Sequence, residues 1–286
     1  MKIGVSSYSL SGAISAGAFD VLGAIDHIAS IGGEHMEVVP SANWSFQSEE
    51  DPLVQQVKER AAAAGIDLSS YTIGANFLTE TEEARQAEIE RVKGQVRIAA
   101  ALGVKFMRHD AGWRPIEQCT VENYYADLPG VVEACQIIAD YAKPYGITTS
   151  VENHGYHFQG SERVHHLVNM VDRENFRTTL DVGNFLCADE NSVAATKNNI
   201  GIASFIHFKD MLIRKKLANT AGFFPTRGGN FLRGTITGHG DVDLISVAEI
   251  IKASGYDGYI SIEFEGPENC IPAVTTSLNY VKALFA

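Results

Sequence analysis

Four residues that could bind a divalent ion or exchange protons stand at the ends of successive apolar runs; they are Glu152, Asp181, His207 and Glu263. Each lies next to apolar residues, so the two-residue alternation of a strand would turn its side chain away from them. Three carboxylates buried together would be costly without a cation. Three oxygen ligands and one imidazole suit Mn²⁺ or Mg²⁺, and also Co²⁺ or Zn²⁺. The pattern therefore predicts one metal site.

The runs that carry these residues belong to a regular alternation of β-rich and helical segments. We expect eight strands, at residues 3–8, 35–39, 67–73, 104–109, 147–153, 177–182, 204–209 and 259–265. Several intervening helices end in a glycine that leads into a strand, as at Gly65 and Gly103. Eight such units predict a single (β/α)8 TIM barrel over residues 1–286, with its active site at the carboxyl ends of the strands. A doubly wound sheet is the alternative, but no G-x-G-x-x-G opens the first βα turn.

Five motifs carry a resemblance to a known superfamily: SVENHG at 150–155, LDVGN at 180–184, IHFKD at 206–210, GHGDVD at 238–243 and GYDGYISIE at 255–263. The sequence resembles the sugar phosphate isomerase/epimerase superfamily of xylose isomerase-like TIM barrels, in its ketose epimerase-like branch. The resemblance implies one ion, usually Mn²⁺ or Mg²⁺, on Glu152, Asp181, His207 and Glu263. It also implies that the two glutamates, Glu152 and Glu263, exchange protons with the carbon beside a carbonyl.

The implied activity is a metal-dependent isomerase or epimerase of a sugar or sugar-like keto-polyol, acting through a metal-stabilised enediolate. Loss of the β-hydroxyl from the same enediolate would give a dehydratase, on an inosose-like keto-polyol or a keto-acid, and this lyase is the alternative. Asn184 and Ile213 stand where ketose epimerases commonly have a substrate-binding His and an Arg. These departures weigh against a free-ketohexose epimerase and leave the metal chemistry intact.

Two further functional classes agree less well with the residues present. One branch of these barrels cuts abasic DNA with three zinc ions, but the third strand, ending Tyr71-Thr72-Ile73-Gly74, offers no ligand for such a site. A sugar-binding protein without catalysis would need no paired acid and base. We therefore expect an enzyme.

Other polar and aromatic residues near strand ends are candidate substrate contacts: His154, Lys209, His109, Glu37, Trp113 and Arg233. Each has a structural alternative, such as an ion pair of Lys209 with Asp181 or Glu265. Residues 210–241 form an unusually long connection between the seventh and eighth strands, and we interpret them as an extended loop over the active site.

The amino-acid composition limits the classes of molecule that the protein is expected to bind. The 286 residues carry a net charge of −12, which disfavours nucleic acid or an anionic membrane as partner. We expect a small-molecule carbohydrate substrate and, from the resemblance, a homodimer or homotetramer. Four dispersed cysteines without a C-x-x-C pair, and the absence of a signal-peptide pattern at the N-terminus, favour a cytoplasmic protein.

Overall fold

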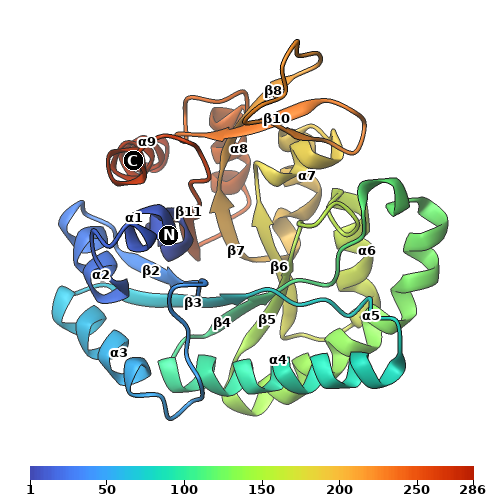
Figure 1. The fold of residues 1–286 in the computed structure, drawn as a ribbon, viewed down its shortest axis with the longest axis horizontal. Coiled ribbons are helices and arrows are strands. Elements are labelled where there is room, and N and C mark those ends of the chain that lie inside the picture. The colour runs from blue at the N-terminus through green and yellow to red at the C-terminus, as the bar shows by residue number, and fades with distance from the viewer.

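The chain closes eight parallel strands into a barrel, as a computed structural model describing residues 1–286 shows (Figure 1). Around the barrel the strands follow the order β1-β11-β7-β6-β5-β4-β3-β2. They are β1 Lys2–Ser6, β2 His35–Val38, β3 Asp67–Ile73, β4 Phe106–His109, β5 Thr148–Glu152, β6 Phe176–Asp181, β7 Ala203–Phe208 and β11 Tyr259–Ile262. The predicted (β/α)8 TIM barrel is confirmed.

Helices follow the strands and form the outer ring. The helices are α1 Ser11–Ser15, α2 Val21–Ser30, α3 Pro52–Ala64, α4 Glu82–Leu102, α5 Val121–Ala142, α6 Ser161–Val171, α7 Ser192–Asn199, α8 Leu244–Ala253 and α9 Cys270–Phe285. Short 3-10 turns cover Ser7–Leu10, Ile116–Gln118, Lys143–Tyr145, Asn184–Ala188 and Ile200–Ile202. Gly65, with φ of 72°, ends α3 in the left-handed conformation that glycine adopts without strain. No helix is both long and apolar enough to cross a bilayer.

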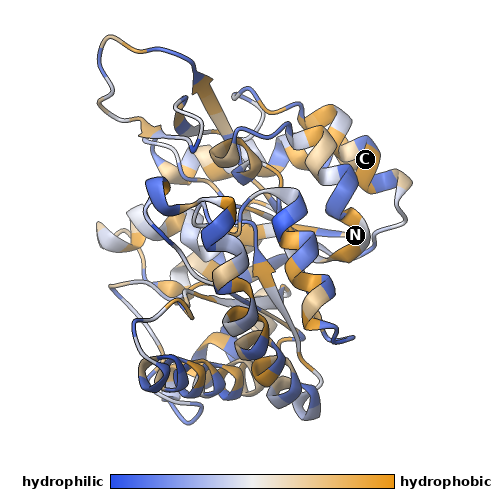
Figure 2. Cartoon of the chain, turned by 90° about the vertical axis from the view of Figure 1, so that its right-hand side faces the viewer, coloured by the Kyte–Doolittle hydropathy of each residue, from blue (hydrophilic) through white to orange (hydrophobic).

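The helices pack their apolar faces onto the outside of the barrel. On α4 these are Ile89, Val92 and Val96, which are all buried, as their helical spacing predicts. They join a single core cluster of 62 buried residues that runs from Ile3 to Val281, so the first and last elements share one core. Figure 2 shows the outer helices carrying both hydrophobic and hydrophilic residues, as expected of helices with one face on the core.

Strand β11 is shorter than the predicted strand 259–265. It ends at Ile262. The N–H of Glu263 still donates to the Phe208 carbonyl at 3.2 Å, whereas that of Phe264 donates to Ser9 Oγ at 2.8 Å. Glu263 therefore sits just beyond the strand, where the chain begins to turn over the barrel mouth.

We call the long connection, residues 210–241, the excursion. It contains a small sheet of its own. Its strands β8 (Asp210–Arg214), β9 (Phe224–Pro225) and β10 (Phe231–Thr235) pair antiparallel and lie beside the barrel end of β7 (Figure 1). The hydroxyl of Tyr156, from the loop after β5, donates to the Pro225 carbonyl at 2.8 Å. Asp189 accepts from Thr226 Oγ1 and Asn230 Nδ2, both at 2.6 Å. The excursion is thus fastened to loops beside the mouth.

Candidate metal centre

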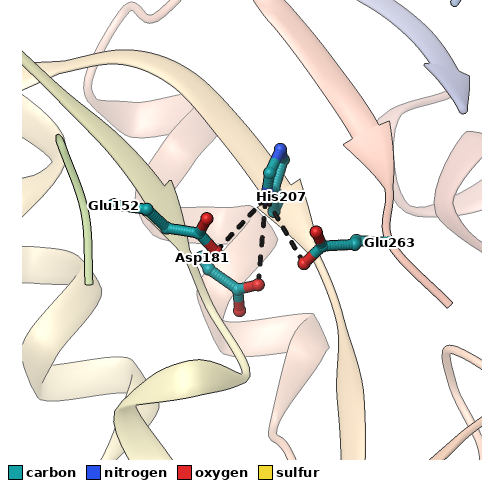
Figure 3. A group of neighbouring side chains, drawn as sticks. All are labelled: Glu152, Asp181, His207 and Glu263. Carbon is teal, nitrogen blue, oxygen red and sulfur yellow. Dashed lines mark ion pairs between the residues drawn. The ribbon is translucent and has the colours of Figure 1, made fainter. Parts of the chain in front are cut away.

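The four residues singled out by type and spacing meet at the carboxyl end of the barrel (Figure 3). Glu152 and Asp181 end β5 and β6, His207 lies in β7, and Glu263 follows β11. One candidate ligand atom from each lies within 4.8 Å of the other three, and all four side chains are buried. His207 Nδ1 is 3.4 Å from Glu152 Oε1, 3.5 Å from Glu263 Oε2 and 3.9 Å from Asp181 Oδ2.

Strand alternation brings these side chains together. Ser150 and Thr179 each precede a cluster residue by two positions, both are buried, and their hydroxyls share a 2.8 Å hydrogen bond between the neighbouring strands β5 and β6. Residues two apart on a strand face the same side, so Glu152 and Asp181 point into the same interior one layer higher. The sequence-based placement of the cluster on the inner face is confirmed.

The side-chain atoms of the cluster that point toward one another are largely free to bind an ion. Asp181 uses Oδ1 to accept from the backbone N–H groups of Gly183 and Asn184, each at 2.8 Å, which turns Oδ2 toward the cluster. Asp181 Oδ2, His207 Nδ1 and Glu263 Oε2 are buried without a directed hydrogen bond, although Lys209 Nζ lies 2.7 Å from Glu263 Oε2. Buried polar atoms without a partner are rare and costly. Three carboxylate oxygens and one imidazole nitrogen fit a divalent ion.

Burial and the closely spaced carboxylates shift the pKa values of the cluster residues. Burial raises the pKa of Asp181 to about 8; Lys209 opposes this rise, and the Glu263 carboxylate adds to it. Burial alone would lower the pKa of His207, but the carboxylates of Glu37, Glu263 and Glu152 hold it well above its usual value. Without a bound cation, the cluster therefore retains protons at neutral pH. A divalent ion would replace them.

Glu37 lies beneath His207 and not at the mouth. Its carboxylate accepts from His207 Nε2, with N–O distances of 2.9 and 3.0 Å, and both side chains are fully buried. The hydroxyl of Thr72 donates to the same carboxylate. The structure places Glu37 away from the position expected for a substrate contact, because the imidazole lies between it and the cluster. Glu37 is a positioning residue for His207.

Strand β4 contributes Arg108, which was not among the residues expected at the site. Its Nη2 lies 2.6 Å from Glu152 Oε2 and 2.7 Å from Asp110 Oδ1. The neighbouring His109 points to the other face, with its ring against Phe77 and its Nδ1 on the Asp110 carbonyl at 2.9 Å. The structure therefore does not bring His109 to the cluster, where a substrate contact was expected. Both residues are polar, and only the register of β4 decides which of them faces inward.

Lys209 forms the ion pairs that were expected as its structural alternative. Its Nζ lies 2.7 Å from Glu263, 3.2 Å from Glu265 and 3.5 Å from Asp181. It also donates to Asn184 Oδ1 at 3.2 Å, while Asn184 Nδ2 donates to Glu152 Oε1 at 2.9 Å. Asn184, noted as a departure from ketose epimerases, thus links Lys209 to Glu152.

The remaining candidates lie at or beyond the rim. His154 is half exposed, and its Nδ1 pairs with Asp110 Oδ1 at 3.1 Å. Trp113 is 60% exposed beside it. Arg233 lies across the Phe223 ring, 5.1 Å from its centroid, on the face of β10 opposite Leu232, which packs against Cys187 and Met211. The structure does not bring Arg233 to the cluster.

A hollow of about 200 Å³ opens above Lys209 and Asn184. His154, Tyr156 and Glu265 line it, and Met211 and Phe224 of the excursion close one side. Lys209 contacts Glu263 of the cluster and Asn184 contacts Glu152, so the hollow lies next to the cluster. We call it the inner hollow.

The GHGDVD motif has a structural explanation. Asp210, directly after Lys209, accepts from the backbone N–H groups of Met211, Gly238, Gly240 and Val242 at 2.8 to 3.2 Å. A Cβ at Gly240 would lie 2.0 Å from Asp210 Oδ1, so only glycine fits there. The motif anchors the end of the excursion next to Lys209.

Comparisons with known proteins agree with this fold. A family model described as a xylose isomerase-like TIM barrel matches residues 25–284. An inosose dehydratase from Lactiplantibacillus plantarum is 27% identical over 215 residues, which cover 71% of this chain and 68% of that protein. Two solved structures share the fold over 99% of this chain and 98% of their own. They are the zinc-bound IOLI protein (TM-score 0.74, 18% identity) and a D-allulose 3-epimerase from Methylomonas sp. (TM-score 0.72, 17% identity).

Proposed function

Because the chain belongs to the family of xylose isomerase-like TIM barrels, we propose that it is a divalent-metal-dependent enzyme that moves a proton beside the carbonyl of a sugar or sugar-like keto-polyol. One observation carries the proposal: three oxygen ligands and one imidazole converge in a buried cluster whose facing atoms largely lack partners. The inosose dehydratase relative, an enzyme named for a keto-polyol, supports the substrate class.

Glu152, Asp181, His207 and Glu263 would hold the ion, which would polarise the substrate carbonyl and stabilise the enediolate formed when the adjacent proton leaves. Glu152 and Glu263 come from β5 and β11, strands separated by β6 and β7, so they flank the cluster. This placement supports assigning one as base and the other as acid. Lys209, 2.7 Å from Glu263, supplies a positive charge beside the reacting region.

Two outcomes follow from the same proton removal. Return of the proton to either carbon gives an isomerase or an epimerase, the activity implied by the ketose epimerase resemblance. Departure of the β-hydroxyl as water gives a dehydratase, and the inosose dehydratase relative favours this second candidate. Asn184 weighs against a free-ketohexose epimerase, since its amide is engaged with Glu152 and Lys209 at a position where ketose epimerases commonly bind substrate through His.

Product analysis tests the proposal. Mn²⁺-loaded protein is incubated separately with ketoses, aldoses, an inosose and a keto-acid, and the products are identified by NMR and mass spectrometry. Products of unchanged mass indicate an isomerase or epimerase, and products that have lost water indicate a dehydratase. Glu152→Gln and Glu263→Gln should abolish turnover, whereas Glu34→Gln, which alters a carboxylate at the opposite end of the barrel, should not. Full turnover in both cluster variants would reject the proposal.

A further inference from the structure

A second hollow lies beside the metal centre, between the loops that follow β4 and β5. Its volume is about 410 Å³, and we call it the outer hollow. Trp113, Pro115, Ile116 and Tyr156 give it an apolar lining. His154, Gly155 and Tyr156 line both this hollow and the inner hollow above Lys209, so the two share a wall. The two hollows therefore lie side by side, with His154, Gly155 and Tyr156 between them.

The local backbone is shaped to make this hollow. Gly155, with φ of 75°, lets the two loops approach closely, since a Cβ there would lie 3.2 Å from Trp113 Cβ. Tyr156 has φ of 62°, a value that non-glycine residues rarely adopt. Its hydroxyl is fixed by the Pro225 carbonyl at 2.8 Å. Such backbone strain persists where the surroundings impose it, and it clusters at ligand sites.

The chemistry of the lining selects an uncharged ligand. Arg114 is the only cationic side chain in the outer hollow besides His154, and Asp127 binds its guanidinium through two bonds of 2.6 and 2.7 Å. His154 in turn pairs with Asp110 at 3.1 Å, so each cationic side chain of the lining already has a carboxylate partner and none is left unpaired for a phosphate or carboxylate. Trp113, 60% exposed, offers an aromatic face, and His154 with Asp110 offers polar atoms at the edge. Such a surface suits a ring with an apolar face and polar substituents.

We propose that the outer hollow is a second binding subsite, and that the substrate is a keto-sugar joined to a further uncharged ring, either a second sugar or an aromatic group. This inference rests on the proposed function for the part of the substrate at the cluster. The second ring stacks on Trp113 while the keto-sugar occupies the inner hollow. His154 and Tyr156 mark the junction between the two.

Equilibrium binding of simple glycosides tests the subsite. The probes are methyl β-D-glucopyranoside, phenyl β-D-glucopyranoside and cellobiose, titrated into Mn²⁺-loaded protein by ligand-observed NMR. Stacking contacts of this kind give roughly a three- to tenfold tighter Kd. We expect this gain for phenyl glucoside, cellobiose or both over methyl glucoside, and the probe that shows it identifies the second ring. Trp113→Ala should abolish the gain, and Trp113→Phe should restore part of it.

Tyr125→Ala is the matched control, because Tyr125 is also 60% exposed but does not line the outer hollow. It should leave the gain unchanged. Equal affinity for all three probes, or a gain that survives in Trp113→Ala, would overturn the subsite. If the gain is present but no compound exchanges a proton in a metal-dependent way, the proposed function fails and the subsite stands as a ring-binding site.

Discussion

Glu37 fixes which nitrogen of His207 faces the cluster. His207 Nε2 lies within 3.0 Å of both Glu37 carboxylate oxygens, so it carries a hydrogen and donates it downward. Nδ1 then points at Glu152, Asp181 and Glu263, at 3.4 to 3.9 Å. In the neutral imidazole this nitrogen has the free lone pair that a metal ion needs. Glu37, on β2, lies two strands from Glu263 and three from Glu152, and it orients the histidine that would bind the ion.

Weakening this hydrogen bond should weaken metal binding. Glu37→Gln keeps the size of the side chain but removes its charge, and loss of such a supporting carboxylate typically lowers metal affinity about 10- to 100-fold. Calorimetric titration with Mn²⁺ would measure the change. Glu34→Gln, which alters the carboxylate bound to the Ile3 N–H, serves as control. Unchanged affinity in Glu37→Gln would contradict the positioning role.

Metal affinity should rise with pH. The pKa of His207 is held well above its usual value by the surrounding carboxylates despite burial, and burial raises that of Asp181 to about 8. Both groups are largely protonated in the metal-free protein at neutral pH, so binding must release protons and is favoured as pH increases from about 6 to about 8. Titrations in buffers of different ionisation enthalpy would count the released protons. Affinity independent of pH and buffer would refute this account.

Removal of Arg108 should destabilise the barrel. The guanidinium bridges Glu152 and Asp110, and its side chain is only 10% exposed. Arg108→Leu leaves two carboxylates without their cation, at a cost of about 3–5 kcal/mol in the free energy of unfolding. Urea denaturation of the metal-free protein measures this cost. Arg173→Leu breaks the Asp140 pair on the surface and should cause no resolvable loss. Similar stability of the two variants would argue against the bridging role.

The cluster could be predicted from the sequence because side chains alternate between the two faces of a strand. Where one polar residue stands among apolar ones, this alternation shows to which face the polar side chain points. His207, between Ile206 and Phe208, leaves no ambiguity. In β4 the adjacent Arg108 and His109 are both polar, so the period alone did not tell which faces inward. The structure puts Arg108 on Glu152 and His109 against Phe77.

The position of a side chain along the barrel axis was harder to predict than whether it points into the barrel. Glu37 does point inward, but strand periodicity carries no information on how far each strand is shifted along the barrel axis. Its position beneath His207 depends on the registers that connect β2, β1, β11 and β7. The sheet within the excursion was also missed, since residues 210–241 contain few alternating positions. Long-range contacts, such as Tyr156 with Pro225, hold it in place.

The excursion should loosen when its anchor is removed. Asp189 accepts from Thr226, Asn230 and the backbone N–H of Gly228. Asp189→Ala leaves these donors without their acceptor, so hydrogen–deuterium exchange should become faster in residues 224–231 and stay unchanged in the barrel strands. Asp26→Ala, on the exposed side of α2, should leave the exchange pattern as it is. Equal protection of 224–231 in both variants would rule out an anchoring role for Asp189.

The central claim is that the Glu152–Asp181–His207–Glu263 cluster holds one divalent ion and enables proton transfer beside a carbonyl. Deuterium incorporation in D₂O, followed by NMR on the inosose and ketose compounds, tests it most directly. Mn²⁺-loaded protein should incorporate deuterium at the carbon next to the carbonyl of at least one compound, and chelator-treated protein should not. Exchange at the same rate after the ion is removed, or a chain that binds no divalent ion, would contradict the claim.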